Sequence, residues 1–125
     1  MPRIVVDATH VDQLREHGGL TGVRDENALE AALARPRQLW HYAPESDLAI
    51  LAAGYAFGLT KAHAFADGNK RIAFLTAMIF LGLNSKDLNA SESDVVQVMV
   101  ALAEGSMNEA QLVEWIRPRI VRLKL

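Results

Sequence analysis

Residues 48–83, LAILAAGYAFGLTKAHAFADGNKRIAFLTAMIFLGL, decide the fold of this chain. Two long apolar runs, Leu48–Thr60 and Ile72–Leu83, flank a short polar stretch, HAFADGNKR (His63–Arg71). Proline and early carboxylates before the first run are typical of a helix start. The second run predicts a buried helix over about Asn69–Leu83. These two nearly all-apolar helices should form the centre of the fold.

Capping residues, glycines and prolines divide the rest of the chain into further helices. Only Arg3–Asp7 has even a weak strand pattern. We expect a compact all-α fold, a single-domain helical bundle of about six helices over residues 1–125. The predicted helices are a short one from a Thr9-x-x-Asp12 capping pattern to Gly18-Gly19, one over Asp25–Arg35 closed by Pro36, the central pair (Pro44-Glu45-Ser46-Asp47 to about Ala62, and about Asn69 to Leu83), one from Ser91 to Gly105, and one over Asn108–Val121 that Pro118 bends or shortens.

Composition excludes several classes of protein. Half of the 125 residues are hydrophobic and 22% are charged, which indicates a folded globule. A net charge of −2 argues against a general nucleic-acid binder, and the absence of cysteine excludes disulfides and a thiol nucleophile. Asp7 comes too early for a signal peptide, and Leu48–Thr60 is shorter than the roughly 20 residues that span a bilayer. We expect a soluble, cytoplasmic protein with no membrane or nucleic-acid partner.

The polar stretch between the central helices combines groups that suit phosphate chemistry. Gly68 permits a tight turn, and the following helix begins with unpaired N–H groups and the positive end of its dipole. Lys70 and Arg71 are unfavourable there unless an anion such as a polyphosphate lies in front of them. Asp67 could hold magnesium, and His63 is suited to accept a proton from an attacking hydroxyl near neutral pH.

A purely structural interpretation remains open for each of these residues. His63 could cap helix carbonyls, and Asp67 could cap the next helix while pairing with Lys70 or Arg71. Their joint occurrence favours a functional site, because fold stability does not require all of them in a row. A zinc site at His63 and Asp67 lacks a third ligand nearby. The remaining histidines show no metal-ligand spacing and are interpreted as surface or connector residues; they are His10, His17 and His41.

The stretch His63-x-Phe65-x-Asp67-Gly68-Asn69-Lys70-Arg71 resembles the signature of the Fic/Doc superfamily, in the form found in Doc (death-on-curing) toxins. Gly18–Arg37 resembles the N-terminal segment of that family, and Ala101–Ile120 its C-terminal helices. The resemblance implies a Fic/Doc-like helical fold with ATP and Mg²⁺ as cofactors. It implies that His63 is the catalytic base, that Asp67 binds magnesium, and that the nucleotide phosphates are held by Gly68, Asn69, Lys70 and Arg71.

Two departures from the family pattern bear on the reaction. Adenylyl-transferring Fic enzymes usually have a glycine where Lys70 stands and an arginine where Phe74 stands. A lysine at the first position is the Doc pattern, which implies transfer of the γ-phosphate to a protein hydroxyl. We therefore expect an ATP-dependent protein phosphotransferase that modifies a Ser/Thr hydroxyl of a host translation factor. The alternatives are a Fic-type adenylyltransferase and a catalytically inactive nucleotide- or peptide-binding module.

Many Fic proteins restrain themselves with a helix of pattern [S/T]-x-x-x-E-[G/N], and this chain lacks the pattern. Its two candidate glutamates, Glu26 and Glu104, are preceded four positions earlier by Gly22 and Val100, which carry no hydroxyl. The resemblance then implies restraint in trans by an antitoxin that folds into a groove of the toxin. We expect this chain to be the toxin of a toxin–antitoxin pair.

The segment Gln38–Tyr42 is an aromatic connector without helical period. By position it resembles the flap on which Fic enzymes lay the target segment as an added strand. That role requires extended backbone, and no proline lies between Pro36 and Pro44. We expect a target-binding flap at Leu39, Trp40 and His41; alternatively, Leu39, Trp40 and Tyr42 merely cover the end of the core.

Overall fold

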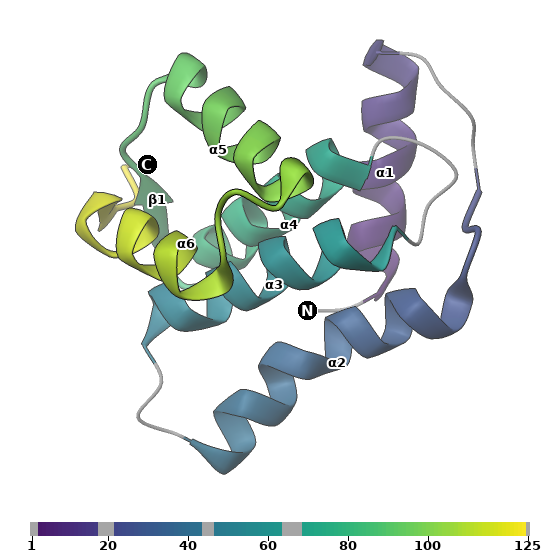
Figure 1. The fold of residues 1–125 in the computed structure, drawn as a ribbon, viewed down its shortest axis with the longest axis horizontal. Coiled ribbons are helices and arrows are strands. Elements are labelled where there is room, and N and C mark those ends of the chain that lie inside the picture. Colours follow the sequence, from purple (N-terminus) through teal and green to yellow (C-terminus); the bar gives the residue numbers. More distant parts are fainter. Residues whose placement is uncertain (1–2, 18–21, 44–46, 64–68, 125) are drawn as a thin grey trace.

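The structure is a computed structural model that describes residues 3–17, 22–43, 47–63 and 69–124 (Figure 1). Within these residues it contains six α-helices, one 3₁₀ turn and a small two-stranded sheet, which confirms the predicted all-α class. In this described part, no helix is both long and apolar enough to cross a membrane. The elements are α1 (Arg3–His17), α2 (Glu26–Tyr42), α3 (Leu48–Ala62), α4 (Asn69–Leu83), β1 (Lys86–Leu88), α5 (Glu92–Glu104), α6 (Glu109–Ile116), η1 (Arg117–Arg119) and β2 (Ile120–Arg122).

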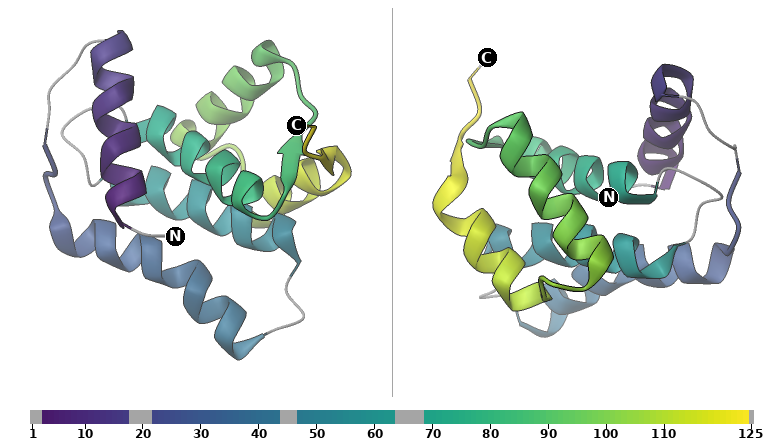
Figure 2. Two further views of the ribbon diagram at one scale, coloured as in Figure 1. Left: turned by 180° about the vertical axis from the view of Figure 1, so that it is seen from behind. Right: turned by 45° about the horizontal axis from the view of Figure 1, so that its top comes forward.

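Helix α3 is the centre of the fold, as its apolar sequence predicts. Asp47 caps it by accepting a hydrogen bond from the backbone N–H of Ile50 at 2.9 Å. Buried residues occur on every side of the helix, from Ala49 to Thr60. Helices α2, α4 and α6 all contact α3, and the ribbon views show α3 enclosed among them (Figures 1 and 2). A helix that is apolar all round is stable in water only when it is enclosed in this way.

The core consists of two clusters that share the α3–α4 pair. The C-terminal cluster joins this pair to α5 and α6, and the N-terminal cluster joins it to α1 and α2. Because α3 and α4 contribute to both, the two clusters are continuous through this helix pair. The buried members of the C-terminal cluster are Ala49, Ala52, Ala53, Ala56, Phe74, Ala77, Leu81, Val98, Leu102, Leu112 and Ile116, and those of the N-terminal cluster are Val6, Leu29, Ala32, Leu33, Tyr55, Leu59, Ile72 and Ala73.

Helix α2 does not end at Pro36, contrary to the sequence prediction, but continues to Tyr42. A proline inside a helix removes one backbone hydrogen bond and crowds the preceding turn. Packing against α3 stabilises it here, because the Pro36 ring is buried against Gly54, where an added Cβ would lie 3.3 Å from the ring Cγ. The carbonyl of Ala32, which Pro36 cannot donate to, faces Gly58.

The start of the chain also differs from the prediction. Residues Arg3–Asp7 form the first turns of α1 and not a strand, and Thr9 lies inside that helix, where its hydroxyl donates to the carbonyl of Val5 at 2.7 Å. Arg3 ties α1 to α2 through ion pairs with Glu26 and Glu30. These tertiary contacts, which no local pattern encodes, outweigh the β-branched residues of the segment.

The expectation that His10 lies on the surface is also wrong. Its side chain is only 3% exposed, on the face of α1 that also carries Val6 of the N-terminal cluster. A histidine four positions after a buried valine lies on the same face of a helix, so the prediction failed because it placed the helix start too late.

The C-terminal third follows the predicted signals most closely. Ser91 caps α5, Gly105 ends it with φ of 81°, and Asn108 opens α6 in a capping box with Gln111. Helix α6 is shortened at Pro118, one of the two predicted effects of that proline: it ends at Ile116, and a 3₁₀ turn follows.

The small antiparallel sheet was not predicted. It pairs Lys86 with Arg122 and Leu88 with Ile120. The expected helical end at Val121 is therefore wrong, since that residue lies in β2. The two strands have three residues each and are separated in sequence by α5 and α6. Such strands are too short to show a recognisable alternation of apolar and polar residues.

Candidate active site

His63 lies directly after the last residue of α3, at the junction that the sequence singles out. Its side chain is exposed, and its backbone adopts the left-handed conformation, with φ 47° and ψ 42°. A residue that ends a helix in this conformation turns the chain sharply away from the helix axis. The imidazole is thus presented at the surface beyond the last turn of α3, where a substrate can reach it.

The backbone carbonyl of His63 has a charged hydrogen-bond donor. Nη2 of Arg24 donates to this oxygen at 2.8 Å, across 39 positions of sequence. Arg24 lies in the short segment between Gly22 and the cap of α2. No sequence pattern distinguishes Arg24, because a single arginine outside the predicted helices carries no signal of a distant partner.

The first turn of α4 provides the second half of the site. It begins at Asn69 and contains no acidic residue, while Lys70 and Arg71 lie on it. The Arg71 side chain is half-buried, and its Nε is buried with no hydrogen-bond partner among the described residues. A guanidinium with an unused donor next to the positive end of a helix dipole is suited to bind an anion.

Part of the predicted site cannot be placed. Asp67 and Gly68 lie outside the described residues, and so do the side chains of Asn69 and Lys70. The expectations for magnesium binding and for most of the phosphate contacts therefore remain predictions. Of the five residues from Asp67 to Arg71, only Arg71 has a described side chain.

The C-terminal end of α3, which His63 follows, and the first turn of α4 lie at the same end of the α3–α4 pair (Figures 1 and 2). Only residues 64–68 separate them in sequence, and a fully extended chain of that length reaches roughly 20 Å. The two helices also pack against each other along their lengths. The structure thus places the C-terminal end of α3 and the predicted anion-binding turn at one end of this helix pair.

Phe74, at the position where adenylyl-transferring Fic enzymes have an arginine, belongs to the core. Its side chain is 4% exposed and its ring meets Trp115 edge-on, with centroids 6.4 Å apart. The position therefore contributes apolar packing between α4 and α6, and this residue supplies no charge to the site.

The predicted flap is wrong in its geometry. Leu39, Trp40 and His41 lie in the last turns of α2, and the Ala43 N–H donates to the carbonyl of Leu39 at 2.8 Å. A helical segment uses its backbone groups internally, so it cannot add a target strand by backbone pairing. The prediction failed because it ended the helix at Pro36.

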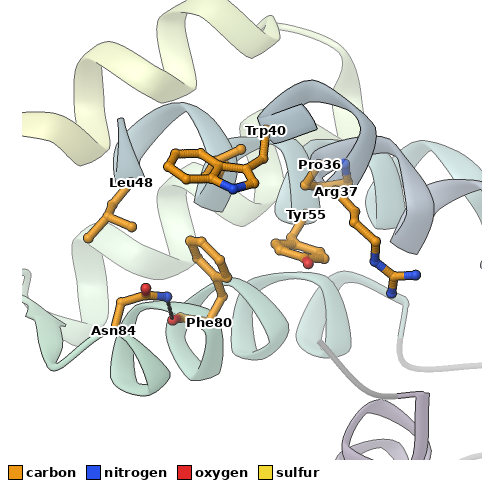
Figure 3. A pocket seen from close by; sticks show the side chains of 8 residues that line it. Pro36, Arg37, Trp40, Leu48, Tyr55, Phe80 and Asn84 are labelled. Atoms are coloured by element: carbon orange, nitrogen blue, oxygen red, sulfur yellow. Dashed lines mark hydrogen bonds between the residues drawn. The ribbon is translucent and has the colours of Figure 1, made fainter. Parts of the chain in front are cut away.

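Trp40 is also remote from His63. It lines a groove of about 350 Å³ with Leu48 and Phe80, beside the first turns of α3 (Figure 3). His63 follows the last of the 15 residues of α3, which corresponds to roughly 22 Å along the helix axis. Tyr55 lies at the base of the groove, where burial raises the pKa of its hydroxyl. The aromatic groove and the candidate active site are thus separate surfaces.

Comparison with known proteins places this architecture in a family. The model of the family described as Fic/DOC matches residues 4–81, more than half of the chain. This chain belongs to the Fic/Doc family. The match runs from the first turn of α1 nearly to the end of α4, so it includes every candidate site residue of this Fic/Doc chain.

Two curated relatives extend the comparison. "Protein kinase doc" of Escherichia phage P1 is 28% identical over 110 residues, which is 88% of this chain and 86% of the relative. "Toxin Doc" of Mycolicibacterium smegmatis (strain ATCC 700084 / mc(2)155) is 40% identical over 94 residues, which is 74% of this chain and 67% of the relative. These alignments reach beyond the residues that the Fic/Doc family model matches.

Proposed function

We propose that this chain is an ATP-dependent protein phosphotransferase of the Doc type, and the toxin of a toxin–antitoxin pair. The observation that carries the proposal is that an exposed imidazole, His63, and the basic first turn of α4 lie at one end of the α3–α4 pair. A base next to an anion-binding turn suits transfer of a phosphoryl group to a hydroxyl. The two relatives, one named a protein kinase and the other a toxin, support the same proposal.

The choice of phosphoryl over adenylyl transfer rests on two positions. Lys70 stands where the adenylyl-transferring branch has a glycine, and Phe74 stands where that branch has an arginine. Phe74 is buried against Trp115. An arginine at position 74 would therefore require a different packing of α4 on α6. Both departures favour the γ-phosphate as the group transferred.

Two features of the described residues support ATP as the proposed substrate. Arg71 has a half-buried guanidinium whose Nε lacks a hydrogen-bond partner among the described residues, so it supplies positive charge beside this turn. The N-terminal N–H groups of α4 would cradle a phosphate. Asp67 would hold magnesium, which neutralises charge on the phosphate oxygens when it is bound.

The proposed reaction balances without a further co-reactant. The oxygen of a Ser or Thr hydroxyl on the target forms a bond to the γ-phosphorus of ATP. The bond from that phosphorus to the β–γ bridging oxygen breaks, and ADP leaves. His63 accepts the hydroxyl proton as the general base. We propose a translation factor of the host cytoplasm as the target, on the family resemblance alone.

The test uses two labelled forms of ATP. The purified chain is incubated with bacterial lysate and ATP labelled at either the α- or the γ-phosphate. We expect a target protein to retain γ-label and no α-label. Retention of α-label would overturn the choice in favour of adenylyl transfer, and retention of neither label would favour an inactive binding module.

The matched variants are His63→Ala and His41→Ala. Both histidines are exposed, but His41 lies on α2. We expect His63→Ala to fold normally and to lose transfer by roughly 10²- to 10⁴-fold, together with its toxicity on expression. His41→Ala should retain both. A His63→Ala variant with wild-type activity would contradict the mechanism.

We further propose that an antitoxin restrains this chain in trans, because the chain lacks the self-inhibitory pattern of many Fic proteins. Growth arrest on expression of the chain alone, relieved by co-expression of the neighbouring gene product, would support the pairing. Growth arrest that persists during this co-expression would show that the neighbouring gene product is not the antitoxin.

A further inference from the structure

The hydrogen bond from Arg24 to His63 joins two segments that the proposed mechanism does not connect. The guanidinium Nη2 lies 2.8 Å from the His63 carbonyl oxygen. This carbonyl belongs to the residue that ends α3, so no later turn of the helix provides it with a donor. A cation is favourable at this position, because the C-terminal end of a helix carries partial negative charge.

The acceptor residue has a backbone conformation that needs support. His63 and Ser85 are the two non-glycine residues with positive φ in the described part of the chain. The left-handed region is sparsely populated by residues that carry a Cβ, and such conformations persist where surrounding contacts hold them. The bond from Arg24 is one such contact, and it acts on the backbone of the proposed base itself.

The conformation of His63 decides where its imidazole is presented. The direction of the Cα–Cβ bond relative to the helix follows from φ and ψ. If His63 returned to the right-handed region, α3 would gain one residue and the side chain would leave the helix in another direction. A base has to lie within hydrogen-bond reach of the proton that it removes, so such a rotation would affect the reaction directly.

The donor is held on the other side by its neighbours. Gly22 makes a turn with φ of 105°, and Asp25 caps α2 through the N–H of Ala28. Val23, which precedes Arg24, packs against the N-terminal cluster, and so does Ala62, which precedes His63. The two partners of the hydrogen bond are therefore each adjacent to a residue anchored in the same cluster.

We propose that Arg24 is a positioning residue for His63. It holds the His63 backbone in the left-handed conformation and thereby orients the imidazole toward the target hydroxyl. This inference rests on the proposed function, since it concerns the same base. The backbone conformation of His63 can be measured independently of any transfer activity.

The fold provides a matched control at the opposite end of the same helix. Nε of Arg117 donates to Oδ2 of Asp47, the N-terminal cap of α3, at 2.7 Å. Arg117→Ala and Arg24→Ala therefore each remove one arginine that fixes one end of α3. A merely structural role for Arg24 predicts that the two variants behave alike.

The experiment compares Arg24→Ala, Arg24→Lys and Arg117→Ala in single-turnover phosphate transfer, with melting temperature measured for each. We expect Arg24→Ala to lower the transfer rate about 10- to 100-fold with little change in the ATP concentration at half-maximal rate. Arg24→Lys should recover part of the loss, because an ammonium also donates to a carbonyl. Arg117→Ala should leave the rate unchanged. A wild-type rate in Arg24→Ala, or an equal loss in Arg117→Ala, would overturn the proposal.

Backbone NMR shifts of His63 provide the readout that does not depend on activity. We expect Arg24→Ala to move them from left-handed toward right-handed helical values, and Arg117→Ala to leave them in place. Unchanged shifts in Arg24→Ala would refute the positioning role. If the wild-type chain transfers no phosphate at all, the proposed function fails, while the NMR comparison still decides whether Arg24 holds His63.

Discussion

Asp47 combines two roles at the start of α3. Its Oδ1 accepts the N–H of Ile50, and its Oδ2 accepts the guanidinium of Arg117. The bond to Arg117 holds the pKa of this carboxyl below its ordinary value, although partial burial opposes the shift. The ionised form of Asp47 is thus more favourable in the folded chain than in the unfolded chain.

This shift predicts a pH dependence of stability. A carboxyl whose pKa is lowered on folding stabilises the folded state above its unfolded pKa, about 3.9 for aspartate, and loses that contribution as the pH falls through the folded value. Asp47→Asn keeps a capping side chain but removes the titration. We expect its melting temperature to fall less steeply than that of the wild type from about pH 5 downward. If the melting temperatures of Asp47→Asn and the wild type fall equally steeply with pH across that range, the lowered pKa of Asp47 is contradicted.

Single residues of the site differ in how well the sequence reveals them. His63 and Arg71 stand out because polar groups are costly between two buried helices, so their presence suggests a purpose. Arg24 does not stand out, since its partner lies 39 positions away and is a backbone carbonyl. Every residue has a backbone carbonyl, so the sequence does not indicate which carbonyl accepts the hydrogen bond from Arg24. The fold determines that it is the carbonyl of His63.

At the scale of secondary-structure elements, the contact between α2 and α3 depends on two glycines of α3. An added Cβ on Gly54 would lie 3.3 Å from the buried ring of Pro36, which is closer than ordinary packing allows. An added Cβ on Gly58 would lie 3.7 Å from the Ala32 carbonyl, an ordinary contact distance. The same substitution therefore meets different surroundings one turn apart.

We expect Gly58→Ala to stabilise the fold by up to about 1 kcal/mol, because alanine favours the helix over glycine. Gly54→Ala has the same helical advantage, but its Cβ presses on a rigid ring that cannot rotate away. Its free energy of unfolding should therefore be lower than that of Gly58→Ala. Chemical denaturation of both variants measures the difference, and equal stabilities would show that Pro36 can shift.

The same contact explains why the end of α2 was predicted wrongly. Helix starts and ends that depend on local capping, such as Ser91, Gly105 and Asn108, were predicted correctly. The end of α2 was not, because Pro36 stops a helix only when no tertiary contact compensates. Packing on Gly54 compensates here, and this error alone turned the helical residues Leu39–His41 into an expected flap.

For the whole molecule, the two core clusters should unfold together. Leu29 lies in the N-terminal cluster and Leu112 in the C-terminal cluster, and both are fully buried. We expect Leu29→Ala and Leu112→Ala each to cost about 2–5 kcal/mol, with one cooperative transition, because α3 and α4 belong to both clusters. Leu83→Ala, at a position 64% exposed, is the control with little effect. Two separate transitions in either buried-leucine variant would show that the clusters unfold independently.

The small side chains of α3 have a consequence for how this protein can diverge over time. Alanines at positions 49, 52, 53 and 56 and the glycine at 54 are buried on a helix that other helices enclose, so larger residues there would force neighbours apart. Neutral drift is then confined to outward-facing positions, such as those around Trp40 and on the exposed side of α5. Substitutions on these outer surfaces leave the packing around α3, and with it the end of the helix where His63 lies, unchanged.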